Sequence, residues 1–247
     1  MGFSHTAIEK RLHALGKSNR SGKWIPHELS EENKATRVIT AGILLKLAKK
    51  GSFLDSIVTS DEKWIFYDNR TRKRQWLSTN EDPKPTPKPD IHSKKTLLCV
   101  WWSSRGLVHF EVLKSRQTVN SELYSSQLHR VDQAIRSQGL EPSSIHFLHD
   151  NAKSHTAKLT MEKIEELGWN VLPHAPYSPD MGPSDYHLFR SMQHFLAEKK
   201  FNDLDEVRIS VQKFFDDQPE EFFKRGIQLL RQKWKEVIKN DGEYLLD

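Results

Sequence analysis

The sequence predicts an α/β fold in which a mixed sheet is flanked by helices. Strand-like apolar segments dominate residues 53–113, and helix-like and strand-like segments alternate over residues 120–200. Hairpins followed by crossover units are typical of a mixed sheet with helices packed on it. Hydrophobic residues make up 36% of the 247 residues, which is enough to build a core.

The first fifty residues predict two helices joined by an extended segment. Residues 4–16 carry an apolar stripe between a capping serine and a terminating glycine. Residues 17–29 are polar and basic, and residues 30–50 form the second predicted helix, which Ser30 caps. The expected inner face of that helix consists of Thr36, Val38, Ile39, Ile43, Leu44, Leu47 and Ala48.

The next region predicts strands interrupted by a basic loop. Strands are expected at residues 53–67, 74–78, 96–103 and 107–113, the last two as a hairpin. Residues 79–95 carry prolines at alternate positions, which favours an extended, polyproline-like arm. Residues 68–95 contain eight Lys or Arg and four Asp or Glu, so the stretch has a net charge of +4.

The second half predicts helices that alternate with short strands. Helices are expected at residues 120–139, 155–168, 184–200, 203–216 and 219–239, and strands at residues 144–150 and 169–173. Gly168 is expected to end its helix. No run of 18 apolar residues occurs, so the sequence predicts no membrane-spanning helix.

Three aspartates stand at positions that favour a shared site. Asp61 lies inside an otherwise apolar strand, where an unpartnered carboxylate costs several kcal/mol. Asp150 ends a strand of the crossover part, where such sheets bind ligands. Asp185 begins a helix and shares the stripe of Leu188 and Phe189, so it is expected to point toward the sheet.

Three carboxylates that converge need cations to stay ionised together. Oxygen ligands suit Mg²⁺ or Mn²⁺, and two such ions can activate a water or a 3′-hydroxyl in phosphodiester chemistry. Each acid also has a simpler interpretation: Asp185 as a helix-start acid, Asp150 as a turn residue and Asp61 as a bulge residue. Only the combination of the three favours a metal site.

Other conspicuous residues have simpler interpretations too. His149, His155 and His174 flank the predicted site and are expected to form hydrogen bonds rather than to bind metal. Trp101 and Trp102 could stack on bases, but at least one is expected in the core. The only cysteine, Cys99, is expected to be a buried apolar residue. The net charge of +5 is compatible with nucleic-acid binding.

The spacing of the acids and the motifs around them resemble the mariner family of DNA transposases. Asp150 and Asp185 are separated by 34 residues, which is the family's spacing between its second and third acids. Residues 149–152 (His-Asp-Asn-Ala) and 177–189 (Tyr-Ser-Pro-Asp-Met-Gly-Pro-Ser-Asp-Tyr-His-Leu-Phe) are similar to the family's segments around those acids. The residues that resemble its linker motif are Trp24, Ile25, Pro26, His27, Glu28 and Leu29.

The resemblance implies an RNase H-like domain with a five-stranded mixed sheet over residues 51–247. It implies that Asp61, Asp150 and Asp185 are the catalytic acids and hold two Mg²⁺ or Mn²⁺ ions per active site. The implied reaction is cleavage of double-stranded DNA at transposon ends and strand transfer into a target TA dinucleotide. Residues 68–95 would be a clamp loop that contacts the partner subunit of a homodimer, with a disordered loop as the alternative.

The implied organisation has two further parts before the catalytic domain. Residues 1–17 resemble a remnant of the second helix-turn-helix, and residues 18–50 the linker and leading helix. A truncated form, or a gene that lost its DNA-reading half, would explain why only a remnant is present. The basic residues expected to contact DNA are Lys10, Arg11, Arg72, Lys73, Arg74, Lys94 and Lys95. The substrate implies a nuclear location.

Two rival interpretations remain open at this point. A domesticated or truncated transposase would act as a DNA- or protein-binding module, or as a residual endonuclease. A ribonuclease H acting on RNA–DNA hybrids would share the chemistry, but the 34-residue spacing and the linker motif disfavour it.

Overall fold

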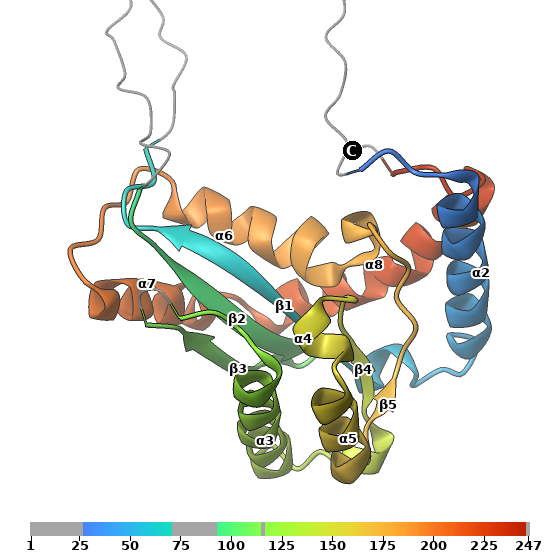
Figure 1. Ribbon diagram of the computed structural model, residues 1–247, viewed down its shortest axis with the longest axis horizontal. Helices are drawn as coiled ribbons and strands as arrows, with labels where there is room; N and C mark the ends of the chain where they lie inside the picture. The colour runs from blue at the N-terminus through green and yellow to red at the C-terminus, as the bar shows by residue number, and fades with distance from the viewer. Residues whose placement is uncertain (1–26, 71–92, 115–116, 246–247) are drawn as a thin grey trace, which may run out of the picture.

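A five-stranded sheet forms the centre of the molecule (Figure 1). The computed structural model describes residues 27–70, 93–114 and 117–245. The strands, in the spatial order β3-β2-β1-β4-β5, are β3 (Gly106–Val112), β2 (Lys95–Ser103), β1 (Ile57–Phe66), β4 (His146–Leu148) and β5 (Asn170–Val171). Strand β1 is central, and it pairs antiparallel with β2 and parallel with β4. The predicted mixed sheet is therefore confirmed.

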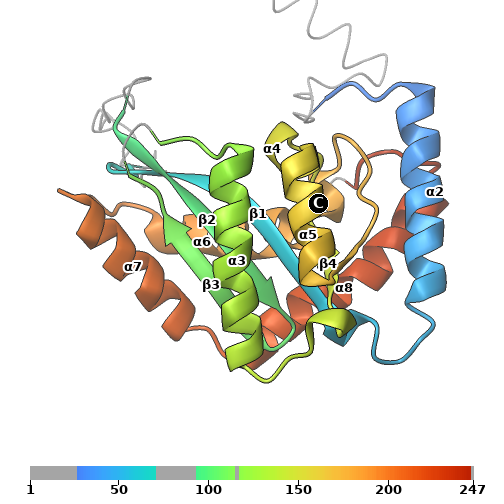
Figure 2. The ribbon, with the colours of Figure 1, turned by 60° about the horizontal axis from the view of Figure 1, so that its bottom comes forward.

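Helices cover both faces of the sheet (Figure 2). On one face lie α3 (Ser121–Ser137), α4 (Lys153–Thr156) and α5 (Lys158–Leu167), and on the other lie α6 (Phe189–Leu196), α7 (Leu204–Asp216) and α8 (Glu220–Lys239). Helix α2 (Glu31–Leu47) packs against α8 (Figure 1).

Strand alternation divides the buried residues into two cores. In β2, Leu98, Val100 and Trp102 belong to the core beneath α6, α7 and α8. Their neighbours Cys99 and Trp101 belong to the core beneath α3 and α5. Successive side chains of a strand point to opposite faces, so this one apolar run supplies both layers. Cys99 and both tryptophans are fully buried, which confirms the core interpretation.

Capping residues set the ends of several helices, and Ser30 and Gly168 do so as predicted. Ser30 caps α2 in a reciprocal capping box, and the Asn120 side chain caps α3. Gly168 ends α5 with a left-handed backbone (φ 76°), which glycine adopts without steric cost. The last two helices also form close to their predicted limits.

Other elements differ from the predictions. The helix expected at residues 155–168 is broken at Ala157, whose backbone is extended, so α4 and α5 are separate. The helix expected at residues 184–200 begins as a π-helical turn, η4 (Ser184–Leu188), and α6 ends at Leu196. Strands β4 and β5 are shorter than expected, because the two run beside each other for only two paired residues.

The predicted inner face of α2 is partly wrong. Ile39 and Ile43 are 63% and 47% exposed, whereas Arg37 is completely buried. Arg37 points inward because its guanidinium donates five hydrogen bonds to acceptors there. An apolar pattern alone could not anticipate such a partner.

Several predictions fall outside the described residues. They include the helix at residues 4–16, the strand at residues 74–78, the proline-rich arm up to residue 92, and most of the segment at residues 17–29. No helix in the described part of the chain is long and apolar enough to cross a membrane.

Candidate active site

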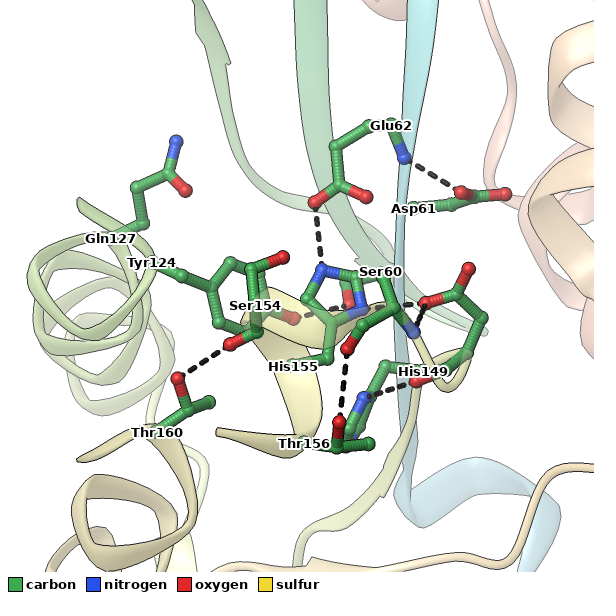
Figure 3. A network of polar contacts seen from close by, with 12 residues as sticks. Ser60, Asp61, Glu62, Tyr124, Gln127, His149, Ser154, His155, Thr156 and Thr160 are labelled. Carbon is green, nitrogen blue, oxygen red and sulfur yellow. Dashed lines mark hydrogen bonds and ion pairs between the residues drawn. The ribbon is translucent and has the colours of Figure 1, made fainter. Parts of the chain in front are cut away.

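The first acid, Asp61, lies in the middle of the central strand. Ile57 and Ile65 share its side of β1 and belong to the core beneath α6, α7 and α8. Glu62 points to the opposite side of the strand (Figure 3). The Asp61 carboxylate accepts a hydrogen bond from the Glu62 backbone N–H (2.7 Å). Two adjacent acids thus serve opposite faces of one strand.

The second acid, Asp150, follows the neighbouring strand. Thr59 of β1 pairs with Leu148 at the end of β4. Because the strands are parallel, two further residues bring Asp150 level with Asp61, beyond the last ladder pair. The Asp150 Oδ1 accepts a hydrogen bond from the Ala152 N–H (2.9 Å), which holds the carboxylate over the start of α4.

The third acid, Asp185, lies in the π-helical turn η4, which packs against β1. The turn is anchored beneath by Ser184, whose hydroxyl accepts from the Trp102 ring N–H (3.0 Å). Asp185 was predicted to point inward with Leu188 and Phe189, but its residue is exposed while those two are buried. The wider π-helical turn changes the angular spacing on which that prediction depended.

Asp150 and Asp185 meet at one pocket of about 430 Å³. The remaining lining residues come mainly from the loop before η4: Asn151, Ala152, His174, Ala175, Pro176, Tyr177, Ser178 and Pro179. The second and third acids thus share one pocket, from the segment after β4 and from η4. Asp61 of β1 does not line this pocket, but it lies in the electrostatic field of both.

The three acids lie in one another's electrostatic field. Burial raises the pKa of Asp61 well above its usual range, and the charges of Asp185, Glu62 and Asp150 raise it further. The Asp185 residue is exposed overall, but partial desolvation of its carboxyl in the pocket, together with the charge of Asp150, raises its pKa to about 6, although Lys63 opposes this. Such shifts are expected where carboxylates crowd together without a counter-ion.

Asp150 behaves in the opposite way because of His155. Burial alone would raise the pKa of Asp150, but hydrogen bonds from His155 and Ala152 outweigh this and hold it at about 2. The His155 Nδ1 lies 2.6 Å from Asp150 Oδ1, and its Nε2 lies 3.2 Å from Glu62 Oε1 (Figure 3). Burial lowers the pKa of His155, but these two bonds raise it to about 10.

The donor set fits a hard divalent cation, because the three acids supply only carboxylate oxygens. The pKa of Asp61 and the pKa of Asp185 are both raised, and a cation bound between the two carboxylates would lower them again. Across the described ranges, no three His, Cys, Asp or Glu side chains already enclose a metal-sized space. The acids would therefore have to draw closer around an ion.

The other histidines near the site form hydrogen bonds or ring contacts. His149 Nδ1 lies 2.9 Å from the Asp150 carbonyl oxygen, and its ring meets that of His155 edge-on. The hydrogen-bonding role expected of His149 and His155 is thus confirmed by these contacts. His174 lines the pocket, and its carbonyl accepts from the Asn151 side chain (2.8 Å).

Few of the predicted DNA-contacting residues lie in the described ranges. The Lys94 ammonium lies 4.0 Å from the Tyr67 ring centre, and the Lys95 ammonium lies 4.5 Å from that of Trp64. Lys10, Arg11, Arg72, Lys73 and Arg74 lie outside them.

The linker motif is described only from its fourth residue onward, since Trp24, Ile25 and Pro26 lie outside the described ranges. The ring of His27 stacks on Tyr177, with ring centres 3.9 Å apart. Glu28 is exposed, and Leu29 is partly buried before the cap of α2.

Sequence reasoning missed a buried ion pair behind the third acid. Arg37 of α2 binds both carboxylate oxygens of Asp180, at 2.8 and 2.6 Å, and also the Ser178 hydroxyl at 2.7 Å. Asp180 and Ser178 belong to the loop that carries Asp185 into the site. The one available signal was an arginine whose helical position brings it in line with Ala41 and Leu44, both of which are buried.

The mixed sheet, with acids on its central strand, after the neighbouring strand and on a following helical turn, defines the carboxylate-based class of phosphodiester-processing enzymes. Comparison with known proteins specifies the family. A family model described as "Transposase (partial DDE domain)" matches residues 66–145.

Two curated relatives match almost the whole chain. The Mariner Mos1 transposase of Drosophila mauritiana is 42% identical over 246 residues, which are 98% of this chain and 71% of the relative. The human histone-lysine N-methyltransferase SETMAR is 38% identical over 249 residues, which are 99% of this chain but 36% of the relative. The chain belongs to the mariner family of transposases, as its motifs predicted.

Solved structures agree with this assignment. The Mos1 paired-end complex with the left transposon end gives a TM-score of 0.90 at 43% identity, covering 98% of this chain and 71% of that one. The Mos1 catalytic domain with Raltegravir and Mn gives 0.75 at 40% identity, covering 90% and 100%. The second match confirms the predicted RNase H-like fold.

Proposed function

We propose that this chain is the catalytic core of a DNA transposase that cleaves phosphodiester bonds at transposon ends and transfers the cut strand into TA target DNA. The observation that carries the proposal is the pocket shared by Asp150 and Asp185, next to Asp61 of the central strand, whose carboxyl lies in the field of both. Solved complexes of the relative Mos1 include a paired-end complex and a strand transfer complex, which supports the same reaction here.

Asp61, Asp150 and Asp185 would hold two divalent ions, Mg²⁺ or Mn²⁺. Paired-end complexes of Mos1 have been solved with each metal. When bound, such ions activate the attacking hydroxyl and stabilise the leaving oxygen. Asp61 and Asp185 present carboxylates whose mutual repulsion favours capture of a cation. Lys63 lies in the field of both these acids and offsets part of their charge before the ion arrives.

The substrate and the assembly follow from the same family membership. Double-stranded DNA would be bound by Lys94 and Lys95, together with Lys10, Arg11, Arg72, Lys73 and Arg74. A homodimer would form through the linker residues 24–29 and through residues 68–95 acting as a clamp loop. Residues 1–17, 18–50 and 51–247 would be the helix-turn-helix remnant, the linker with its leading helix, and the catalytic domain, in a protein of the nucleus.

The test is a plasmid-nicking assay with Mg²⁺ or Mn²⁺. The unmodified chain is compared with Asp150→Asn and Asp185→Ala, and with Asp55→Asn as a matched control, since Asp55 is exposed and away from the acids. We expect metal-dependent nicking that both site variants lose and the control retains. Nicking should also fall steeply as salt increases, because contacts to phosphate dominate binding.

The same assay separates the rival functions. A folded chain that binds Mn²⁺ and DNA but never nicks would refute the catalytic proposal and favour a binding module descended from a transposase. The match covers 36% of SETMAR, so in that relative the matching segment is one part of a larger protein. Faster cleavage of an RNA–DNA hybrid than of duplex DNA would instead favour a ribonuclease.

A further inference from the structure

The second acid, Asp150, has an exposed side chain, yet it is hydrogen-bonded to the buried ring of His155. The Asp150 side chain is 53% exposed, whereas the side chain of His155, on which it leans, is 1% exposed. His155 comes from the short helix α4, and it reaches back across the sheet edge to Glu62 of β1. This ring is thus a bridge between the central strand and the segment that carries Asp150.

Both ring nitrogens of His155 are committed to carboxylates. Nδ1 lies 2.6 Å from Asp150 Oδ1 and Nε2 lies 3.2 Å from Glu62 Oε1. The two carboxylates therefore hold the ring from opposite sides, one at each nitrogen. The orientation of the ring is then fixed at two points, and Figure 3 shows it between Glu62 and the segment beyond β4.

Neighbouring groups hold the plane of the ring as well. The Tyr124 ring of α3 packs against it, with ring centres 4.2 Å apart. The Tyr124 hydroxyl lies 3.0 Å from the Ser60 hydroxyl on β1, so α3, β1 and α4 all meet at this point. Behind the ring, the Thr160 hydroxyl donates to the Ser154 carbonyl (2.6 Å), which fixes the backbone of α4 beside α5.

The bridge leaves Asp150 with one free oxygen. Oδ1 accepts from both the His155 ring and the Ala152 N–H. Oδ2 has no hydrogen-bond partner among the residues that the structure describes, and Asp150 lines the pocket that it shares with Asp185. A carboxylate restrained through one oxygen presents the other in a defined direction, as supporting hydrogen bonds do for metal ligands in general.

We propose that His155 is a positioning residue that fixes Asp150 through Oδ1 and thereby aims Oδ2 at the divalent ion, with Glu62 as its anchor on β1. The inference rests on the proposed function, because it concerns an acid assigned there to the metal site. It adds His155 and Glu62 to the residues on which catalysis depends, although neither is expected to touch DNA or metal.

The test measures Mn²⁺ affinity by calorimetry on the unmodified chain and on two substitutions. His155→Phe keeps a packed ring but removes both donors. His155→Asn keeps an amide N–H near the position of Nδ1 and loses the reach to Glu62. We expect roughly 10- to 100-fold weaker Mn²⁺ binding for the Phe variant, and a smaller loss for the Asn variant. His129→Phe on the exposed side of α3 is the matched control and should bind Mn²⁺ as the unmodified chain does.

Two further measurements separate positioning from a general loss of stability. In an Asp150→Asn background, His155→Phe should cause no additional loss of Mn²⁺ affinity, because the group that it positions is already neutral. In the metal-free protein, ¹⁵N-histidine spectra should show a hydrogen-bonded Nδ1 for His155, and Asp150→Asn should shift that signal while a control substitution such as His129→Phe does not.

The outcomes are distinct. Equal Mn²⁺ affinity in the Phe variant and the unmodified chain would overturn the proposal, and so would equal losses in the Phe and Asn variants. Failure of the unmodified chain to bind Mn²⁺ would refute the metal site of the proposed function, and with it the metal-directed part of this inference. The ring signals would then still decide whether His155 holds Asp150.

Discussion

Replacing Arg37 by methionine should destabilise the protein more than any surface change on the same helix. The guanidinium is completely buried, and it donates five hydrogen bonds, two of them to the carboxylate of Asp180. Asp180 is itself almost buried, with a side chain 9% exposed. The substitution would therefore leave a buried carboxylate that, among the described residues, keeps only the Leu245 N–H as a hydrogen-bond donor.

The expected loss follows from that geometry. Breaking a buried ion pair by removing one partner costs about 3–5 kcal/mol, since the remaining charge stays desolvated. For a chain of this size, each kcal/mol lowers the melting temperature by roughly 2–4 °C. We therefore expect the melting temperature of Arg37→Met to fall by about 6–20 °C. The underlying loss is a large part of a total free energy of unfolding on the order of 5–15 kcal/mol.

The assays are thermal unfolding, which gives the melting temperature, and urea unfolding, which gives the free energy, both followed by circular dichroism. Lys46→Met is the control because Lys46 is exposed on the same helix. A double-mutant cycle adds Asp180→Leu. The double variant should be less destabilised than the sum of the two single losses, because it leaves no uncompensated charge. A loss below about 1 kcal/mol for Arg37→Met, or strictly additive losses, would refute the argument.

Three further results are expected. Gly226→Ala should destabilise the protein by about 1–3 kcal/mol in thermal unfolding despite the better helix propensity of alanine, because its methyl group would lie 2.5 Å from a ring carbon of His187; unchanged stability would contradict the packing. Burial opposes ionisation of Glu111, but bonds from His109, Arg130 and Gln127 lower its pKa to about 2, so Glu111→Gln should cost about 2 kcal/mol at pH 7. That difference should be lost as the pH falls from about 4.5 to about 2, and a constant difference across this range would be inconsistent with the ion pair. Asp61→Asn should raise the melting temperature in EDTA while abolishing nicking, because a carboxylate with a raised pKa destabilises the metal-free fold above its usual pKa; a lower melting temperature would show that Asp61 is satisfied without metal.

Local pattern was sufficient for the elements that local forces define. The apolar run of β2 and the turn after it predicted the hairpin, and Ser30 and Gly168 marked helix ends through their own backbone preferences. The acids were found because each stands where its neighbours are apolar or where a strand ends. Their spacing then connected them to a known family.

The supporting residues could not be found in that way, because their partners are distant in sequence. The bond from His155 to Glu62 spans 93 residues, and the bond from Arg37 to Asp180 spans 143. The break at Ala157 and the π-helical turn at Asp185 likewise depend on tertiary packing rather than on propensity. A histidine near an acid predicted a hydrogen bond, but only the fold shows which two carboxylates it joins.

The three acids differ in how they are restrained, and this difference follows from their places in the fold. Asp61 lies in a strand paired on one side with β2 along its whole length, so its backbone needs no other support. Asp150 lies beyond the end of β4 and Asp185 lies in the π-helical turn η4, and a buried basic side chain supports the segment that carries each. His155 is hydrogen-bonded directly to Asp150. Arg37 instead forms an ion pair with Asp180, which lies in the loop that leads to Asp185. A site that closes around metal would gain from this arrangement, because Asp150 keeps Oδ2 without a partner among the described residues while the loop before Asp185 stays anchored. Substitution of either basic residue should therefore weaken metal binding before it abolishes the fold.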